Sequence, residues 1–144
     1  MTATFEAFQE KFQVSRLELW RSDHWTWSLR PVHCTLGASV LSLNRWCPQL
    51  GEMTADEGAS FAKACAYVEG RYAATFKPVK INYLKLGMVD AHLHFHVIPR
   101  YDTAQQFAGQ HWSDTGWPGQ PDVGHGADMA DDPHLLDIRD ALKG

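Results

Sequence analysis

The feature of this sequence that most constrains its fold is the stretch DAHLHFHVIPRY, residues 90–101. Three histidines alternate in it with three large apolar residues: His92, Leu93, His94, Phe95, His96 and Val97. Successive side chains of a β-strand point to opposite faces, so the alternation predicts a strand with one apolar face and one histidine face. We expect the apolar face to be buried against a helix, and the strand to end at Pro99, which cannot continue a central ladder.

Three interpretations of the histidine face compete. The first is a half-exposed strand on which the histidines have no special role. The second is a metal site, but His92 and His96 would lie roughly 13 Å apart on a regular strand, whereas zinc ligands sit about 2 Å from the metal. All three histidines therefore cannot bind one ion, and no cysteine or acidic pair in the sequence stands out as a further ligand.

The third interpretation is nucleophilic catalysis. An imidazole can attack phosphorus, form a covalent phosphoryl-type intermediate and be released by water. Neighbouring imidazoles on the same face can donate hydrogen bonds to phosphate oxygens and protonate a leaving group. This interpretation explains both the number and the spacing of the histidines, which the other two do not.

The remaining patterns predict an α+β fold, in which one long helix packs on a face of an antiparallel sheet of about five strands. Alternating apolar residues predict four strands besides the histidine strand, over residues 16–21, 25–29, 35–45 and 79–87. In the third of these, Ser39, Leu41 and Leu43 share one buried face. The fourth is separated from the histidine strand by only a few residues, so we expect the two to be antiparallel neighbours.

Helix signals accompany these strands. A capping box starts the long helix at Thr54, and its apolar stripe continues to about Ala74. Shorter helices are expected over residues 3–13, where phenylalanines recur at helical spacing, and after Asp132, which is followed by proline. Residues 101–131 are rich in Gly, Pro, Asp and Gln, and we expect them to be mostly loop.

Length and composition narrow the class of protein. The 144 residues suit a single domain, with a core over about 15–101 and a C-terminal loop and helix over 102–144. The three cysteines form no CxxC pair, which favours a reducing, cytoplasmic location. We expect no membrane span, because no apolar run approaches about 20 residues. The net charge of −4 argues against binding to nucleic acid, although it allows a small anionic ligand.

The run HLHFHVIPR resembles the motif of the histidine-triad (HIT) family, His-φ-His-φ-His-φ-φ, where φ is apolar. The resemblance extends over roughly residues 15–101. In this range the sequence is similar to bacterial HIT hydrolases of the dinucleoside polyphosphate hydrolase type. It implies a HIT-like fold, a homodimer, and hydrolysis or transfer at the α-phosphate through a covalent nucleotidyl-histidine intermediate. The substrates implied are dinucleoside polyphosphates, nucleoside phosphoramidates or adenylylated groups. The alternative is a HIT-fold protein that binds a nucleotide with little or no turnover.

The resemblance also implies roles for individual residues. His94 would be the nucleophile, His96 would contact the α-phosphate and the bridging atom, and His92 would orient the other two. Asn82 resembles an asparagine that many members place near the phosphate, although it could equally be a strand-edge residue. We expect no cofactor and no essential metal, because a histidine nucleophile with histidine donors needs no Lewis acid.

The chain departs from the family pattern in the stretch that precedes the triad. Many members carry a Gly-Gln-Ser/Thr stretch there, whose side chains hold the phosphate, whereas this chain has Gly87, Met88 and Val89. We expect the backbone N–H groups around Met88 to bind the phosphate instead. Lys85 is a candidate phosphate cation, with a solvated strand lysine as the alternative.

Two further departures concern earlier strands. A fourth histidine that is usual in the family is replaced here, and Ser39 is a candidate to stand in for it, while we expect His33 to be a surface histidine. Arg30 occupies the region where many members have a ribose-binding Asp or Asn. The stretch WSDTGWPG, residues 112–119, is either a lid over the site or a cover for the sheet.

Overall fold

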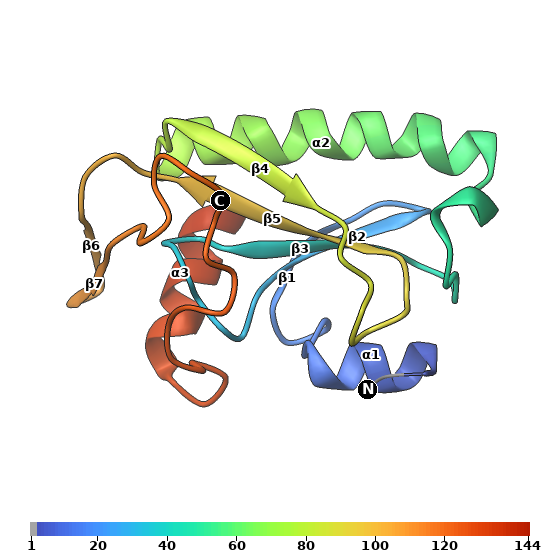
Figure 1. Cartoon of the computed structure of the whole chain (residues 1–144), viewed down its shortest axis with the longest axis horizontal. Coiled ribbons are helices and arrows are strands. Elements are labelled where there is room, and N and C mark those ends of the chain that lie inside the picture. Colours follow the sequence, from blue (N-terminus) through green and yellow to red (C-terminus); the bar gives the residue numbers. More distant parts are fainter. Residues whose placement is uncertain (1–2) are drawn as a thin grey trace.

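A computed structural model describes residues 3–144 of the chain (Figure 1). The elements follow in this order: α1 (Phe5–Lys11), β1 (Glu18–Arg21), β2 (Trp25–Leu29), β3 (Ser39–Leu43), the 3-10 helix η1 (Leu50–Glu52), α2 (Ala55–Thr75), β4 (Lys80–Leu84), β5 (His94–Arg100), β6 (Gln105–Phe107), β7 (Gln110–Trp112) and α3 (Pro133–Lys143). Five strands form an antiparallel sheet in the order β1-β2-β3-β5-β4, and β6 pairs with β7 in a separate hairpin. The fold is α+β, as predicted.

The long helix α2 lies along one face of the sheet (Figure 1). Its capping box is formed, because the Thr54 hydroxyl accepts from the Glu57 N–H and the Glu57 carboxylate accepts from the Thr54 N–H. The apolar residues of the histidine stretch pack on this side, where Leu93 is fully buried and the Phe95 ring contacts Phe61 of α2. The predicted burial of the apolar face against a helix is therefore confirmed.

The C-terminal helix α3 completes the core on the side of α2. Asp132 caps it by accepting a hydrogen bond from the His134 N–H, and Pro133 occupies its first turn, as the sequence predicts. Its buried residues Leu135 and Ile138 belong to the same core cluster as the sheet and α2. The core that supports the site is thus built from both ends of the chain.

The short helix α1 lies on the opposite side of the sheet from α2 (Figure 1), across the histidine face. Phe8 is fully buried, and its ring centroid lies 4.8 Å from that of His92 and 4.9 Å from that of His94. Phe12 packs against His94 and His96 at 5.5 and 6.3 Å. The histidines do occupy the face predicted for them, but that face is covered and all three are buried.

The predicted end of the histidine strand at Pro99 is wrong. Strand β5 continues through Pro99 to Arg100, and Pro99 lies opposite Ile81 in β4. The other neighbour, β3, pairs with β5 only as far as Val97. Pro99 therefore lies beyond the part of β5 that has a strand on both sides, where a proline interrupts no central ladder.

The segment predicted to be mostly loop contains a small hairpin, β6–β7. Its two-residue turn is Ala108-Gly109, with φ of 51° and 76°, between the paired residues Phe107 and Gln110. Positive φ at both central positions is the geometry of a type I′ turn, which matches the twist of paired strands. The strands are three residues long, too short for an alternating pattern to be recognised in the sequence.

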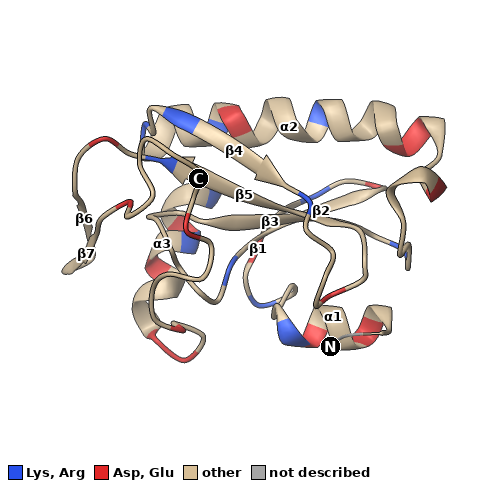
Figure 2. Ribbon diagram, in the orientation of Figure 1, with Lys and Arg blue, Asp and Glu red and all other residues tan. Residues whose placement is uncertain are grey.

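Charged residues are spread through this architecture. Figure 2 shows lysine and arginine positions on α1, α2, β4, β5 and α3 rather than on one element. Over residues 3–144, we find no helix with the length and apolar character needed to cross a membrane. The charges that bear on function are therefore the few that lie beside the histidines.

Candidate active site

His92 is held in one tautomer by the backbone. The Cys47 N–H donates to its Nδ1 at 3.3 Å, and its Nε2 lies 2.8 Å from the Leu43 carbonyl oxygen. An N–H group can only donate and a carbonyl oxygen can only accept, so Nδ1 carries the lone pair and Nε2 carries the proton. Burial lowers the pKa of His92 to about 4, which keeps the ring neutral. Both ring nitrogens are used, so His92 positions its neighbours.

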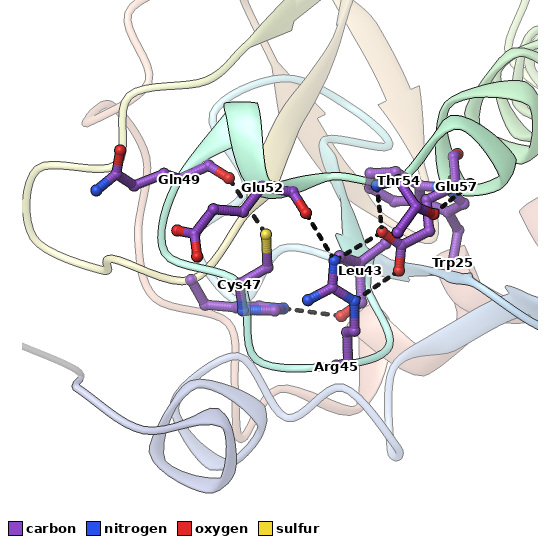
Figure 3. A network of polar contacts seen from close by, with 9 residues as sticks. Trp25, Leu43, Arg45, Cys47, Gln49, Glu52, Thr54 and Glu57 are labelled. Carbon is purple, nitrogen blue, oxygen red and sulfur yellow. Dashed lines mark hydrogen bonds and ion pairs between the residues drawn. The ribbon is translucent and has the colours of Figure 1, made fainter.

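The loop that holds His92 is fixed in turn by the start of α2 (Figure 3). Arg45 donates to both carboxylate oxygens of Glu57, at 2.7 and 2.8 Å, and to the carbonyl oxygen of Glu52 at 2.9 Å. The hydrogen bonds from Arg45 hold the pKa of Glu57 at about 2, so the carboxylate stays charged. The capping box of α2 and the support of the histidine site therefore share one carboxylate.

His94 presents a nucleophilic nitrogen. Its Nδ1 lies 2.6 Å from the carbonyl oxygen of His92, so Nδ1 must be the donor and the lone pair resides on Nε2. The residue is 2% exposed and lines a cavity. Burial lowers the pKa of His94, the positive charges of Lys85 and Lys11 lower it further, and Asp90 opposes them. The imidazole is therefore neutral and nucleophilic near pH 7.

His96 lies beside His94, with ring centroids 5.0 Å apart in a T-shaped arrangement. Its Nδ1 is buried and has no hydrogen-bond partner within residues 3–144. Burial, followed by the positive charge of Arg30, lowers the pKa of His96 to about 3. A buried polar atom without a protein partner is costly, and in a ring that also lines a cavity it marks a candidate functional group.

A cavity of about 530 Å³ opens over the two histidines. Most of its wall is apolar, and charged residues line it from several parts of the chain: Lys11, Arg30, Asp90 and Asp128. A site of this size with a mainly apolar wall and few polar groups suits a small organic ligand. Together, the neutral imidazoles and the flanking cations can bind an anion at the histidines and an apolar ring above them.

An ion pair between α1 and the loop that precedes β5 closes one side of the cavity. Lys11 Nζ lies 2.8 Å from each oxygen of the Asp90 carboxylate. No pattern in the sequence assigned a role to Asp90 or to Lys11. The helical spacing of Phe5, Phe8 and Phe12 indicated that α1 has a buried face, but no sequence signal identified its partner.

Three of the predicted site residues lie at the cavity or near it. Arg30 and Met88 line the cavity, and the Lys85 charge lies close enough to lower the pKa of His94. Arg30 is 8% exposed, and it donates to the Cys34 sulfur at 3.2 Å and to the Val123 carbonyl oxygen at 2.9 Å. These contacts fix its guanidinium beside His96.

Ser39 does not reach the site, and its predicted role in place of a fourth histidine is wrong. Its hydroxyl accepts from Trp27 Nε1 at 2.7 Å and bonds to the Tyr72 hydroxyl at 2.8 Å, on the α2 side of the sheet. The alternation of β3 explains this, because Val40, opposite His96, takes the histidine face. His33 is also not a surface residue. It is 2% exposed and accepts a hydrogen bond from the backbone of the following turn.

Asn82 shares the histidine face but does not line the cavity. It lies opposite Ile98, one pair further along β5 than His96 on that face. Its Oδ1 accepts a hydrogen bond of 2.8 Å from Arg100, and it lines a neighbouring cleft instead. The structure therefore brings His94, His96, Arg30 and Met88 together and leaves Asn82 outside.

The residues also bear on the expectation of a metal-free site. Within residues 3–144, no group of three or more His, Cys, Asp or Glu side chains is arranged to hold a metal ion. Imidazoles at the spacing of a strand do not converge on one point. That the activity needs no metal or cofactor stays a prediction.

Comparison with known proteins gives a clear result for the fold. No family model matches the sequence, and no curated protein matches it. Several solved structures do. A hypothetical histidine triad nucleotide-binding protein from Sulfolobus tokodaii is 17% identical with a TM-score of 0.64, and the match covers 88% of this chain and 80% of that one. A histidine triad protein from Sinorhizobium meliloti is 19% identical with a TM-score of 0.65, covering 90% and 93%.

A histidine triad protein from Bradyrhizobium japonicum is similar over nearly its whole length. It is 15% identical with a TM-score of 0.61, and the match covers 97% of both chains. Identities this low show the arrangement of helices and strands, and that arrangement is the one the triad motif implied. The chain therefore has the histidine-triad fold, with His94 and His96 at the start of β5 and His92 two residues before it.

Proposed function

We propose that this protein is a HIT-type enzyme, a single-domain nucleotide hydrolase or transferase that acts at an α-phosphate. The observation that carries the proposal is the hydrogen bond from His94 Nδ1–H to the His92 carbonyl oxygen, 2.6 Å long. It leaves Nε2 as the lone-pair nitrogen of a ring that lines a cavity with cationic neighbours. A nucleophile needs this combination of an available lone pair and access to an anionic substrate.

The proposed reaction has two steps. In the first, His94 Nε2 attacks the α-phosphorus, a P–N bond forms, and the bond from phosphorus to the leaving group breaks. The negative charge of the bound substrate favours the protonated form of His96, which passes its proton to the leaving group. In the second step, water attacks the phosphorus and its proton passes to His96, the P–N bond breaks, and the mononucleotide is released with neutral His94. An acceptor other than water in the second step would make the reaction a transfer.

The cavity supports the binding of a nucleotide. Phe12, Pro31 and Val32 supply apolar surface that suits a base or ribose, and Arg30 and Lys11 supply cations that suit phosphate. Arg30 is beside His96, so it would contact the phosphate that His94 attacks. One of the structural neighbours is named as a nucleotide-binding protein, which supports the same ligand class.

The second candidate function is nucleotide binding with little or no turnover. It is favoured by the stretch before the triad, where exposed Met88 and Val89 lack the polar side chains that would hold a phosphate during reaction. The two functions differ in one measurement. A binding protein would show saturable affinity for a nucleotide and no release of mononucleotide.

Trapping of the covalent intermediate tests the proposed function. We expect rapid acid or base quench during turnover of diadenosine tetraphosphate, followed by mass spectrometry, to find a nucleotide adduct on the peptide AHLHFHVIPR. Fragmentation should place it on His94, and the His94→Ala variant should form no adduct. An adduct on another residue, or turnover without any adduct in repeated quenches at several times, would contradict the mechanism.

We also propose that the protein is a homodimer. Strand β4 is an edge of the sheet, and an edge strand offers unpaired backbone groups to another chain. Half-buried Ile81 and Tyr83 on β4 pack against the core cluster beside Phe61 and Cys65 of α2, which extends the edge into an apolar surface. Light scattering at micromolar concentration should report about twice the chain mass of 16.2 kDa. A monomer under these conditions would contradict this proposal.

A further inference from the structure

A second cleft lies next to the histidine cavity and has no role in the reaction described above. Its volume is about 610 Å³, and it lies between β4 and the segment 117–121. Residues of β4 and β5 form one wall, and the segment that contains the cis Trp117-Pro118 bond forms the other. The cleft and the cavity share no lining residue, so the cleft is a separate compartment.

The register of the sheet places this cleft directly beside the histidines. Leu84, which lines the cleft, lies opposite His96. Lys80, at the far end of the cleft, lies opposite Arg100, which is four residues or roughly 13 Å further along β5. Side chains at every second position share a face, so the cleft opens on the histidine side of the sheet.

An apolar contact lies between the two compartments. Leu84, from the cleft, and Val123, from the cavity, pack against the same cluster around Ile98. A ligand held at His94 and His96 can therefore extend along β4 over this contact into the cleft. A chain of several phosphates is long enough to pass from the histidines into the neighbouring cleft.

The floor of the cleft is rigid and its polar groups are oriented. The Arg100 side chain is 3% exposed, and its Nε lies 2.6 Å from Asp114 Oδ2. Arg100 Nη1 also donates to Asn82 Oδ1 at 2.8 Å, which fixes the amide of Asn82. Within residues 3–144, the Asn82 Nδ2 group has no protein acceptor, so its donors remain for a ligand.

An aromatic ring and a free cation complete the cleft. The Arg100 guanidinium lies 5.6 Å from the centroid of the half-buried Trp117 ring, which holds the ring in place by a cation–π contact. Lys80 is exposed and has no ion pair within residues 3–144. Stacking on Trp117, hydrogen bonding to Asn82 and charge pairing with Lys80 suit a planar base attached to a phosphate chain.

We propose that this cleft binds the leaving group, and that the leaving group is a nucleotide whose base stacks on Trp117. The inference rests on the proposed function. It selects one of the substrate classes named above, because a dinucleoside polyphosphate would fill both compartments. The small amine of a nucleoside phosphoramidate would leave the cleft empty.

Comparison of two substrates tests the inference. The variant Trp117→Leu should lower kcat/KM for diadenosine tetraphosphate by about tenfold, the size expected for a lost base stack. Lys80→Ala should lower it by about fivefold, because it removes a cation that pairs with phosphate. The same variants should change kcat/KM for adenosine 5′-phosphoramidate by less than about twofold. Lys63→Ala, an exposed lysine of α2 on the other side of the sheet, is the matched control and should affect neither substrate. Urea unfolding of each variant checks that the fold is retained.

A binding measurement separates failure of this inference from failure of the proposed function. In titration calorimetry with the His94→Ala protein, Lys80→Ala should weaken the binding of diadenosine tetraphosphate by about fivefold and leave the binding of AMP unchanged. If the wild type turns over neither substrate but this selective loss occurs, the enzyme proposal fails and the cleft assignment stands. Equal losses for both ligands and both substrates, or no loss for either, would overturn the assignment.

Discussion

The two faces of β5 are built from adjacent residues but have opposite properties. On one face Val97 and the preceding Leu93 are buried in the core cluster that includes α2, a helix of 21 residues, and the Phe95 ring packs against the ring of Phe61. On the other face the histidines are covered by α1, a helix of seven residues, with a cavity left beside it. The difference shows that the packing that stabilises the sheet lies on one side and the candidate catalytic groups lie on the other.

Covering the histidines has a chemical effect that the α2 face does not need. The phenylalanine rings of α1 remove water from the imidazoles, and this desolvation is the largest cause of their lowered pKa values. Imidazoles that stay neutral are competent nucleophiles. At acidic pH, however, the unfolded chain binds more protons than the folded chain, which favours unfolding. The α1 face therefore gains reactivity at some cost in stability at acidic pH.

The largest expected difference between the faces is in catalysis. His94→Ala should lower kcat/KM for diadenosine tetraphosphate by roughly 10⁴-fold or more, since it removes the attacking nitrogen. Phe95→Leu, the adjacent residue on the α2 face, should change kcat/KM per folded molecule only a few-fold. Steady-state assays at pH 7.5, with the folded fraction checked by circular dichroism, compare the two. Wild-type turnover by His94→Ala would remove the functional distinction between the faces.

The next effect concerns stability and has the opposite pattern. Leu93→Ala should reduce the free energy of unfolding by about 2–5 kcal/mol, because it leaves a cavity in the α2 face. Leu50→Ala, at an exposed leucine outside both faces, should change the free energy of unfolding by no more than about 0.5 kcal/mol. Urea unfolding at pH 7.5 measures both variants. A loss from Leu93→Ala as small as that from Leu50→Ala would show that the α2 face is not the main support of the fold.

The pH dependence of stability sharpens the comparison further. The pKa values of His92 and His96 are about 4 and about 3, mainly through burial, whereas an unfolded histidine titrates near 6.5. Below about pH 6.5 the unfolded chain binds protons that the folded chain does not, so stability should fall as pH decreases, until each folded pKa is passed. Each histidine contributes up to about 1.4 kcal/mol per pH unit in this window. Unfolding in urea at pH 7.5, 6 and 5 should show the decline.

A matched pair of variants tests the source of this decline. His96→Asn should reduce the pH slope, whereas His111→Asn, at an exposed histidine of β7, should leave it unchanged. Measurements above pH 5 avoid the titration of Glu57, whose stabilising charge is lost only as pH falls from about 4.5 through about 2. Constant stability from pH 7.5 to 5 would contradict the burial of neutral imidazoles under α1.

The smallest effect concerns the ion pair that fastens α1. Lys11→Ala should reduce the free energy of unfolding by no more than about 1 kcal/mol, because Lys11 is 46% exposed. It should also raise the pKa of His94, since Lys11 lowers that pKa and Asp90 raises it. The acidic limb of the kcat/KM profile should then move to higher pH. The control is Arg21→Ala. Arg21 pairs with Glu18 and its side chain is also 46% exposed, and its loss should leave the pH profile of kcat/KM unchanged.

Local patterns predicted most of the fold and part of the site. The alternation in residues 90–101 assigned the two faces of β5, and the capping box at Thr54 located the start of α2. The alternation of β3 also placed Ser39 on the α2 side with Leu41, as the structure confirms. Its assignment to the site came from the family resemblance, and here the periodicity of the strand was the better guide.

The remaining features depend on contacts between distant parts of the chain. Pro99 is accommodated in β5 because β3 has already ended at Val97, a fact of register that no local pattern contains. Lys11 and Asp90 meet across 79 positions of sequence, and the hydrogen bond from Arg30 to Val123 joins residues 93 positions apart.

The sequence by itself determined which side chains face which way, because that direction follows from the geometry of each strand and helix. It therefore placed His94 between two histidines on one face, with apolar neighbours on the other. Only the tertiary structure decided what covers that face, which nitrogen of each imidazole carries the proton, and which cations flank the cavity. The cover and the cations depend on the docking of α1 and of the segment around Val123 against β5. The tautomers depend on the backbone groups of Leu43, Cys47 and His92. All of these contacts are set by the packing of the whole molecule.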